Sequence, residues 1–297
     1  MAKAAWTCNG NIAGTTQFRI WGKAISDALT ALGMIKTADT GQIDWATVTK
    51  PSPNTIAGYE VWRFNDSLQS TVPIFFNLSY GTANSGNHPR LVITIGSNSD
   101  GAGVITGLPA SFTIVSNGSS TPEDNSSRLS FMASDGSGIS FIHQADNTLA
   151  SIRSVFVIDR FRNIDGSPNN NGYIIMLQIG GQSFMTTYYQ DKKTISLYNG
   201  SISRGMALMP IDLTAGMSLS ISGTVYFMPY NFIVPGGSGI QRVKMILCYA
   251  ASDFGFNSDQ MITHLGASRK YKTLGTNFGY CDSRSQQYAT AALWQED

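Results

Sequence analysis

Only a few side chains in this sequence have the type and spacing that catalysis would need. Hydrolysis of a glycosidic bond uses two positioned carboxylates. The best candidates are Glu60, inside a stretch rich in aromatic and β-branched residues, and Asp66 just after it. Glu60 is better explained as a structural residue, either paired with Arg63 or at a strand edge. We therefore expect no catalytic residue, although a fold can bring together carboxylates that are distant in sequence.

The other reactive groups are scattered along the chain. His88, His143 and His264 are far apart, and none has a metal-ligand spacing such as HxxxH. Residues 163–166 match half of a calcium-binding loop, but Phe161 stands where the first acidic ligand would be, which favours a simple turn. The three cysteines form no CxxC pair, so we expect free thiols. These patterns predict no metal, no cofactor and no enzymatic activity.

The composition is poor in charge. Charged residues make up 13% of the chain, about half the ~25% of an ordinary domain. Glutamate occurs only three times, and Ser, Thr, Asn and Gly are frequent instead. This bias suits strands and turns, and it also suits a subunit whose surface is covered by neighbours in an assembly. The formal net charge of +1 gives no field that would attract nucleic acid or an anionic membrane.

Neither a membrane helix nor a secretion signal is expected. The longest apolar runs, such as residues 172–179, are far shorter than the ~20 residues that a membrane helix needs. The N-terminal sequence MAKAAWTCNG lacks the apolar core of a secretory signal. We therefore expect the chain to be made and kept in a cytoplasm.

One amphipathic helix is predicted over residues 16–33. Its apolar residues recur at helical spacing: Phe18, Trp21, Ile25, Ala28, Leu29 and Leu32. Thr15 or Thr16 is expected to cap its start, and Gly33 to end it in a left-handed conformation. Gly22 costs about 1 kcal/mol against alanine in a helix, a cost that makes sense if an aromatic ring or a backbone packs against that turn.

Nearly all of the chain after Gly58 is predicted to form short strands separated by turns. The predicted strands are residues 91–95, 111–115, 128–133, 154–161, 172–179, 219–227 and 243–249. This pattern favours a mainly β fold, β-sandwich or jelly-roll-like, with the one N-terminal helix. A polar, serine-rich segment at residues 116–127 suggests two domains, 1–120 and 121–297. A long loop within a single domain explains that segment equally well.

Two segments of the first third resemble a known family. They are FRIWGKAISDALTALGMIKTADTGQIDW (residues 18–45) and YEVWRFNDSLQSTVPIFFNLSYG (residues 59–81). They are similar to the motifs WG…IS..L…G…T.DTGQI.W and YE.WRF.D.LQ.T.P.FF…YG of a family of tailed-bacteriophage virion structural proteins. SVFVIDRFRNIDGSPNNNGY (residues 154–173) resembles the second half of that family more loosely.

The resemblance implies a non-enzymatic component of the virion, synthesised in the bacterial host cytoplasm. We expect many copies in a tail, baseplate or fibre-attachment position, contacting other virion proteins and copies of itself, but not nucleic acid or membrane. One alternative is a capsid decoration (cement) protein. Another is a carbohydrate-binding or depolymerising receptor protein, in which Tyr188-Tyr189 and residues 226–230 could form an aromatic platform for host-surface glycan.

Two packing expectations follow from the residues. The helix face that carries Trp21 is expected to pack against the aromatic block from Trp62 to Phe76. Contacts between subunits are expected at strand edges and at the chain ends, where Trp6 and Leu293-Trp294 lie.

Overall fold

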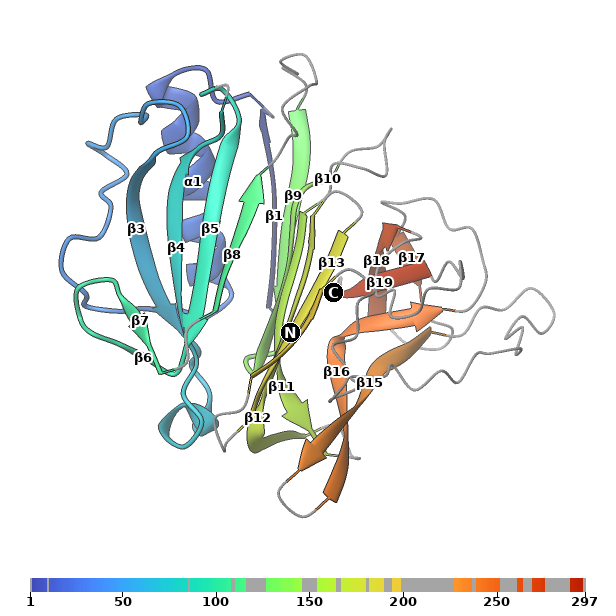
Figure 1. The fold of residues 1–297 in the computed structure, drawn as a ribbon. Helices are drawn as coiled ribbons and strands as arrows, with labels where there is room; N and C mark the ends of the chain where they lie inside the picture. The colour runs from blue at the N-terminus through green and yellow to red at the C-terminus, as the bar shows by residue number, and fades with distance from the viewer. Residues whose placement is uncertain are drawn as a thin grey trace.

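The structure, a computed structural model of the 297-residue chain, is built mainly from antiparallel sheets (Figure 1). Side-chain burial is described only as far as Tyr173. The backbone is described for residues 2–9, 11–84, 86–107, 110–115, 127–145, 154–163, 167–179, 182–189, 194–198, 227–236, 239–251, 261–263, 269–275 and 289–295.

Three large sheets and one small one contain the described strands. The first five-stranded sheet has the spatial order β2 (Ile35–Lys36), β3 (Ile56–Arg63), β4 (Phe75–Thr82), β5 (Pro89–Gly96) and β8 (Ala110–Val115). The seven-stranded sheet has the order β1 (Ala2–Asn9), β9 (Ser127–Ser134), β10 (Gly138–Ala145), β11 (Ser154–Arg162), β12 (Pro168–Ile179), β13 (Gln182–Tyr189) and β14 (Thr194–Tyr198). The second five-stranded sheet has the order β15 (Phe227–Gly236), β16 (Gly239–Ala251), β19 (Ala289–Gln295), β18 (Arg269–Gly275) and β17 (Met261–Thr263). β6 (Asn98–Ser99) and β7 (Ile105–Thr106) form a small hairpin.

The predicted helix is confirmed as α1 (Thr15–Ala31), and all six of its predicted apolar residues are buried. Gly33 ends it with a φ of 78°. The Gly33 N–H donates to the Thr30 carbonyl and the Met34 N–H to the Leu29 carbonyl, both at 3.0 Å. These two bonds form a Schellman motif, which satisfies carbonyls that the end of the helix would otherwise leave unpaired.

The predicted N-terminal cap is wrong. Gly14 occupies the N-cap position, with extended backbone and no side-chain hydrogen bond to the helix. The hydroxyl of Thr15 instead accepts a hydrogen bond from the Lys50 N–H at 3.3 Å. The threonine therefore holds a neighbouring loop against the start of the helix.

Gly22 lies directly beneath the indole ring of Trp45, the close aromatic contact that its sequence position called for. A Cβ atom added to Gly22 would lie 1.9 Å from Cη2 of Trp45. Glycine is therefore required here because any larger side chain would displace the ring.

We expect Gly22→Ala to destabilise the fold by about 1–3 kcal/mol, the usual cost of overpacking a core. In a Trp45→Ala background the same substitution should instead stabilise it, by up to about 1 kcal/mol, because only helix propensity then remains. Chemical denaturation of the four proteins measures this reversal of sign. Equal destabilisation in both backgrounds would contradict the packing explanation.

The first five-stranded sheet turns one face toward the core. Trp62 pairs with Phe76, which pairs with Ile95, and all three side chains are buried. In the next row of this face, Glu60 pairs with Leu78, which pairs with Ile93. A carboxylate therefore stands within the apolar face of the sheet.

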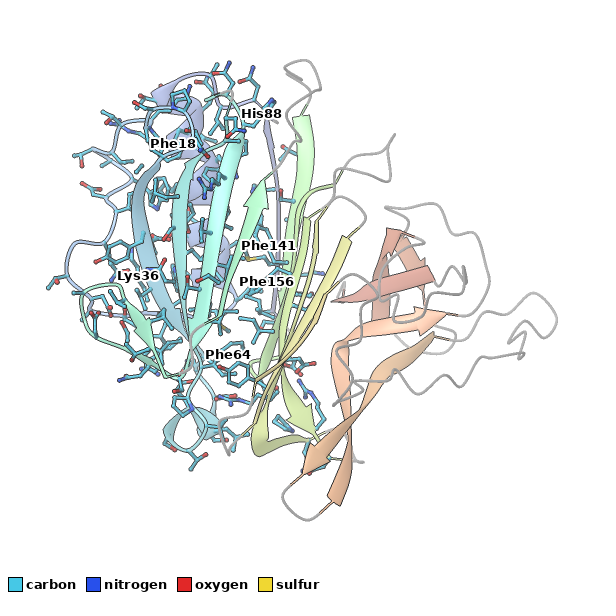
Figure 2. The ribbon with its side chains drawn as sticks, viewed as in Figure 1. Phe18, Lys36, Phe64, His88, Phe141 and Phe156 are labelled. Atoms are coloured by element: carbon cyan, nitrogen blue, oxygen red, sulfur yellow. The ribbon has the colours of Figure 1, made fainter. Side chains whose placement is uncertain are left out.

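One buried cluster joins α1, this sheet and the seven-stranded sheet. Trp21 of α1 lies edge-on to Tyr80 of β4, with ring centroids 5.7 Å apart, and shares the cluster with Trp62 and Phe76. The helix face and the aromatic block therefore share one core, and the ring contact between helix and sheet is made with Tyr80, just beyond that block. Figure 2 shows Phe64, Phe141 and Phe156 in the layer between the two sheets.

The mainly β fold with one N-terminal helix is confirmed for the described residues. Apart from β1, the strands of the seven-stranded sheet follow one another in chain order. The sandwich or jelly-roll arrangement stays a prediction. Six of the seven predicted strands lie within observed ones, and residues 219–226 lie outside the described part.

The division into residues 1–120 and 121–297 also stays a prediction, since residues 116–126 are outside the described part. Residues 1–120 and residues 121–297 are nevertheless in contact. β1 of the first segment pairs with β9 of the second, and both segments contribute side chains to the buried cluster.

Candidate functional site

Four carboxylate or guanidinium side chains are almost completely buried in the described part of the chain: Glu60, Asp159, Arg160 and Arg162. Removing a charge from water is costly unless it is paired and hydrogen-bonded. Each of the four has such partners, and they define three separate sites, around Glu60, Arg160 and Arg162.

The carboxylate of Glu60 is fully buried and accepts four hydrogen bonds. Oε2 accepts from the Tyr80 hydroxyl at 2.8 Å. Oε1 accepts from Ser26 Oγ at 2.9 Å, Lys36 Nζ at 2.7 Å and Trp45 Nε1 at 3.1 Å. The predicted pairing with Arg63 is wrong, because Arg63 donates to the Phe64 carbonyl and Lys36 is the basic partner.

These five residues, here called the Glu60 cluster, come from five different segments. Ser26 lies on α1, Lys36 on β2 and Tyr80 on β4, while Trp45 lies in the loop between β2 and β3. The Trp45 and Tyr80 rings meet at 90°, with centroids 4.8 Å apart, and shield the carboxylate from water. One charged group therefore ties the helix, a loop and three strands together.

The cluster also changes the acidity of Tyr80. Burial raises the pKa of its hydroxyl well above the ordinary value, and the charge of Glu60 and the hydrogen bond to it raise the pKa further. Tyr80 thus stays protonated and keeps donating to Glu60. Both oxygens of the fully buried Glu60 carboxylate are thus occupied by partners within the fold.

Asp66 pairs with Arg160, and this ion pair joins two sheets. Asp66 precedes the short 3-10 helix η1 (Ser67–Ser70) between β3 and β4, whereas Arg160 lies on β11. Arg160 Nη2 donates to Asp66 Oδ1 at 2.8 Å, and its Nε donates to Oδ2. Its Nη1 donates to the Val72 carbonyl at 2.6 Å, and the guanidinium lies 5.9 Å from the Phe64 ring centroid.

Arg162 forms a second buried charge cluster. Its Nη2 donates to Asp159 Oδ1 at 2.8 Å, to Asp135 Oδ2 at 2.7 Å and to Ser137 Oγ at 2.9 Å. Burial lowers the pKa of the guanidinium, but the charges of Asp159 and Asp135 outweigh this and raise it overall. The cluster fixes the Asp135-Gly136 turn between β9 and β10 to the end of β11.

Asp39, in the DTGQI motif, holds the β6–β7 hairpin against the outer side of the first sheet. Its Oδ1 accepts from Thr37 Oγ1 at 2.6 Å. Its Oδ2 accepts from the Gly103 N–H at 3.0 Å and from the Ser99 hydroxyl. Burial raises the pKa of this carboxyl, but these hydrogen bonds outweigh burial and leave the pKa below its ordinary value.

The lowered pKa of Asp39 predicts that the protein loses part of its stability as the pH falls. The contribution of Asp39 to stability is complete above the pKa of about 4 that it has in the unfolded chain. It is lost as the pH falls through the lower pKa of the folded state. The stability difference between wild type and Asp39→Asn should therefore shrink on acidification. A difference that does not change with pH would contradict the role given to Asp39.

Glu60 and Asp66, the two carboxylates singled out in the sequence, share no hydrogen-bonding partner. Each is paired with its own basic residue, Lys36 or Arg160.

The structure describes only some of the other candidate site residues that the sequence suggested. The His88 side chain is buried. Asn163 donates twice to Ser167, from its backbone N–H to the carbonyl and from its side-chain amide to the hydroxyl, both at 2.9 Å. The turn expected at residues 163–166 stays a prediction, since residues 164–166 lie outside the described residues. The side chains of His143, His264 and the aromatic platform at 188–189 and 226–230 lie outside the described residues.

Sequence reasoning missed the roles of Arg160, Arg162 and Asp135. A signal was present, since VFVIDRFR places three charges in an otherwise apolar strand. Within the described residues, no three His, Cys, Asp or Glu side chains are grouped so as to hold a metal ion. No helix in that same part is long and apolar enough to cross a membrane.

Comparison with models of known protein families finds no match for the sequence, and comparison with curated proteins finds none either.

Proposed function

We propose that the chain is a non-enzymatic structural protein of a tailed-bacteriophage particle, built into the tail, baseplate or fibre-attachment region in several copies. The observation that supports this most is where the residues of the family resemblance lie. Trp45 of the DTGQI.W motif packs on Gly22 of the WG motif and donates to Glu60 of the YE motif. The motif residues therefore serve to assemble the fold.

A second link between the motifs supports the same conclusion. The side-chain oxygen of Gln42 accepts from the Val61 N–H at 2.9 Å, and its amide donates to the Thr37 carbonyl at 2.7 Å. The Gln42 side chain thereby provides a hydrogen-bond acceptor for the backbone of β3 at the point where β2 has ended. A motif used in this way specifies a rigid building block, as a particle subunit requires.

The sheet edges favour contact with neighbouring subunits. β8, at the edge of the first sheet, has the sequence ASFTIV and carries no charge. β1, at the edge of the seven-stranded sheet, carries only Lys3. Proteins that remain monomers commonly protect such edges with charged residues, especially lysine. Edges that carry few such charges suit a subunit that docks on copies of itself or on other virion proteins.

Quantitative mass spectrometry of purified virions, with tails and capsids separated, tests the proposal. We expect the chain in the tail fraction, at a copy number set by the tail symmetry. Hundreds of copies in the capsid fraction would instead support a decoration protein. Absence from the virion, or release of reducing ends from host-surface glycan by the purified chain, would contradict the proposal.

A further inference from the structure

The most distinctive element outside the charged sites is β1. It is the only strand of the seven-stranded sheet that comes from the N-terminal part of the chain, since the others lie between residues 127 and 198. Figure 1 shows β1 running beside β9. Their register extends from Ala2 opposite Ser134 to Asn9 opposite Ser127. β1 can therefore leave without breaking any pairing between β9 and β14.

The side chains of β1 are less deeply buried than those of the neighbouring strands. Ala2, Ala4 and Trp6 face the core but are only partly buried, unlike the fully buried residues of the neighbouring strands. The Trp6 ring stacks on Phe141, with centroids 5.9 Å apart. Its Nε1 is buried without a hydrogen-bond partner, which costs free energy. β1 is thus held by the backbone ladder to β9, by the Trp6 stacking and by packing beside α1.

The chain is firmly anchored immediately after this strand. Ile12 is buried, and its N–H donates to the Asn87 carbonyl at 2.6 Å. The Ala13 carbonyl accepts from Lys50 Nζ at 2.9 Å. The anchor fixes the point from which residues 2–9 extend, whichever copy of the sheet they join.

We propose that β1 is exchanged between copies, so that the β9 edge of one copy pairs with residues 2–9 of its neighbour. This inference rests on the proposed function in so far as it requires several copies side by side. An exchanged strand makes the same ladder and the same Trp6–Phe141 contact as a retained one. The equilibrium between the retained and the exchanged strand is therefore set by the entropic cost of association. That cost is small when neighbours are already held close together.

Cys8 provides a direct test, because it lies opposite Arg128 in the β1–β9 register. Cross-strand neighbours have Cα atoms about 4.5–5.5 Å apart, within the range that a disulfide can bridge. One chain keeps Cys8 and Arg128, and a second chain, distinguishable by size, carries Cys8→Ser and Arg128→Cys. A disulfide at this position then joins the two chains only when β1 of the first pairs with β9 of the second.

The two full-length chains are co-expressed, oxidised and separated without reductant. At equal expression, exchange predicts cross-linking of about half of the Cys8-containing chains, since neighbours are paired at random. The matched control replaces the second chain by one with Cys8→Ser and the native Arg128, and should remove the cross-link. Circular dichroism checks that the variants fold as the wild type does.

A single chain with Cys8 and Arg128→Cys provides the opposite readout. If it forms its disulfide within one chain while the co-expressed pair remains unlinked, β1 stays in its own copy and the proposal is overturned. Chains found in virions without cross-linking would leave the proposed function standing and remove only the exchange. Cross-linked chains that are absent from virions would support the exchange and contradict the proposed function.

Discussion

Glu60→Ala is expected to lower the free energy of unfolding by about 3–5 kcal/mol, because each buried donor left without its acceptor costs about 1–3 kcal/mol. The substitution leaves the buried hydroxyl of Tyr80 and the indole N–H of Trp45 without their acceptor. It also opens a cavity in the apolar face of the first sheet. Urea or guanidinium denaturation, followed by tryptophan fluorescence, measures the loss.

Two variants calibrate this result. Tyr80→Phe removes one hydrogen bond to the same carboxylate and should cost about 1.5–3 kcal/mol. Lys23→Ala removes one member of an exposed ion pair with Asp27 on α1 and should cost less than about 0.5 kcal/mol. If Glu60→Ala proved as mild as Lys23→Ala, the carboxylate would not be the link between the five segments.

Arg160→Ala should have an effect of similar size, about 3–5 kcal/mol. Its guanidinium is fully buried, and its loss leaves Asp66 and the Val72 carbonyl unpaired between two sheets. Asp66→Ala should also be strongly destabilising, because it leaves the buried guanidinium of Arg160 without its carboxylate partner. The same denaturation assay applies to both variants.

The double variant Asp66→Ala, Arg160→Ala distinguishes the loss of the ion pair from destabilisation that each substitution causes by itself. Contacting residues typically show coupling energies of about 0.5–3 kcal/mol. The double variant should therefore be more stable than the sum of the single losses predicts. Strict additivity would mean that the two side chains act independently, and that the ion pair does not hold the sheets together.

Local patterns in the sequence were sufficient to predict α1 and six of the nineteen described strands. The apolar period from Phe18 to Leu32 identified the buried helix face, and Gly33 identified its end. Gly22 even indicated that an aromatic ring must lie close by, although not which ring. Such features depend on residues within a few positions of one another, which is why a single sequence reveals them.

The partners of the buried charges could not be predicted in the same way. Asp66 and Arg160 are separated by 94 positions, and no periodicity relates two residues at that distance. Glu60 was assigned to nearby Arg63, whereas its basic partner, Lys36, lies 24 positions away. The pairing of β1 with β9 likewise depends on how the chain returns to its own beginning. Tertiary packing decides each of these contacts.

The strands near the two chain ends differ in how they are paired. β1 is an edge strand, whereas β19, which carries Leu293 and Trp294, is paired on both sides, with β16 and β18. Of the two ends proposed as contact elements, the N-terminal strand therefore has the free backbone edge.

The proposal that the chain is a subunit of a tailed-phage particle is tested most directly by a cryo-electron microscopy map of that particle. We expect density for the first five-stranded sheet, α1 and the seven-stranded sheet, repeated by the symmetry of the tail, with neighbouring copies in contact along β1 or β8. A complete tail and capsid in which no density accommodates this fold would contradict the account.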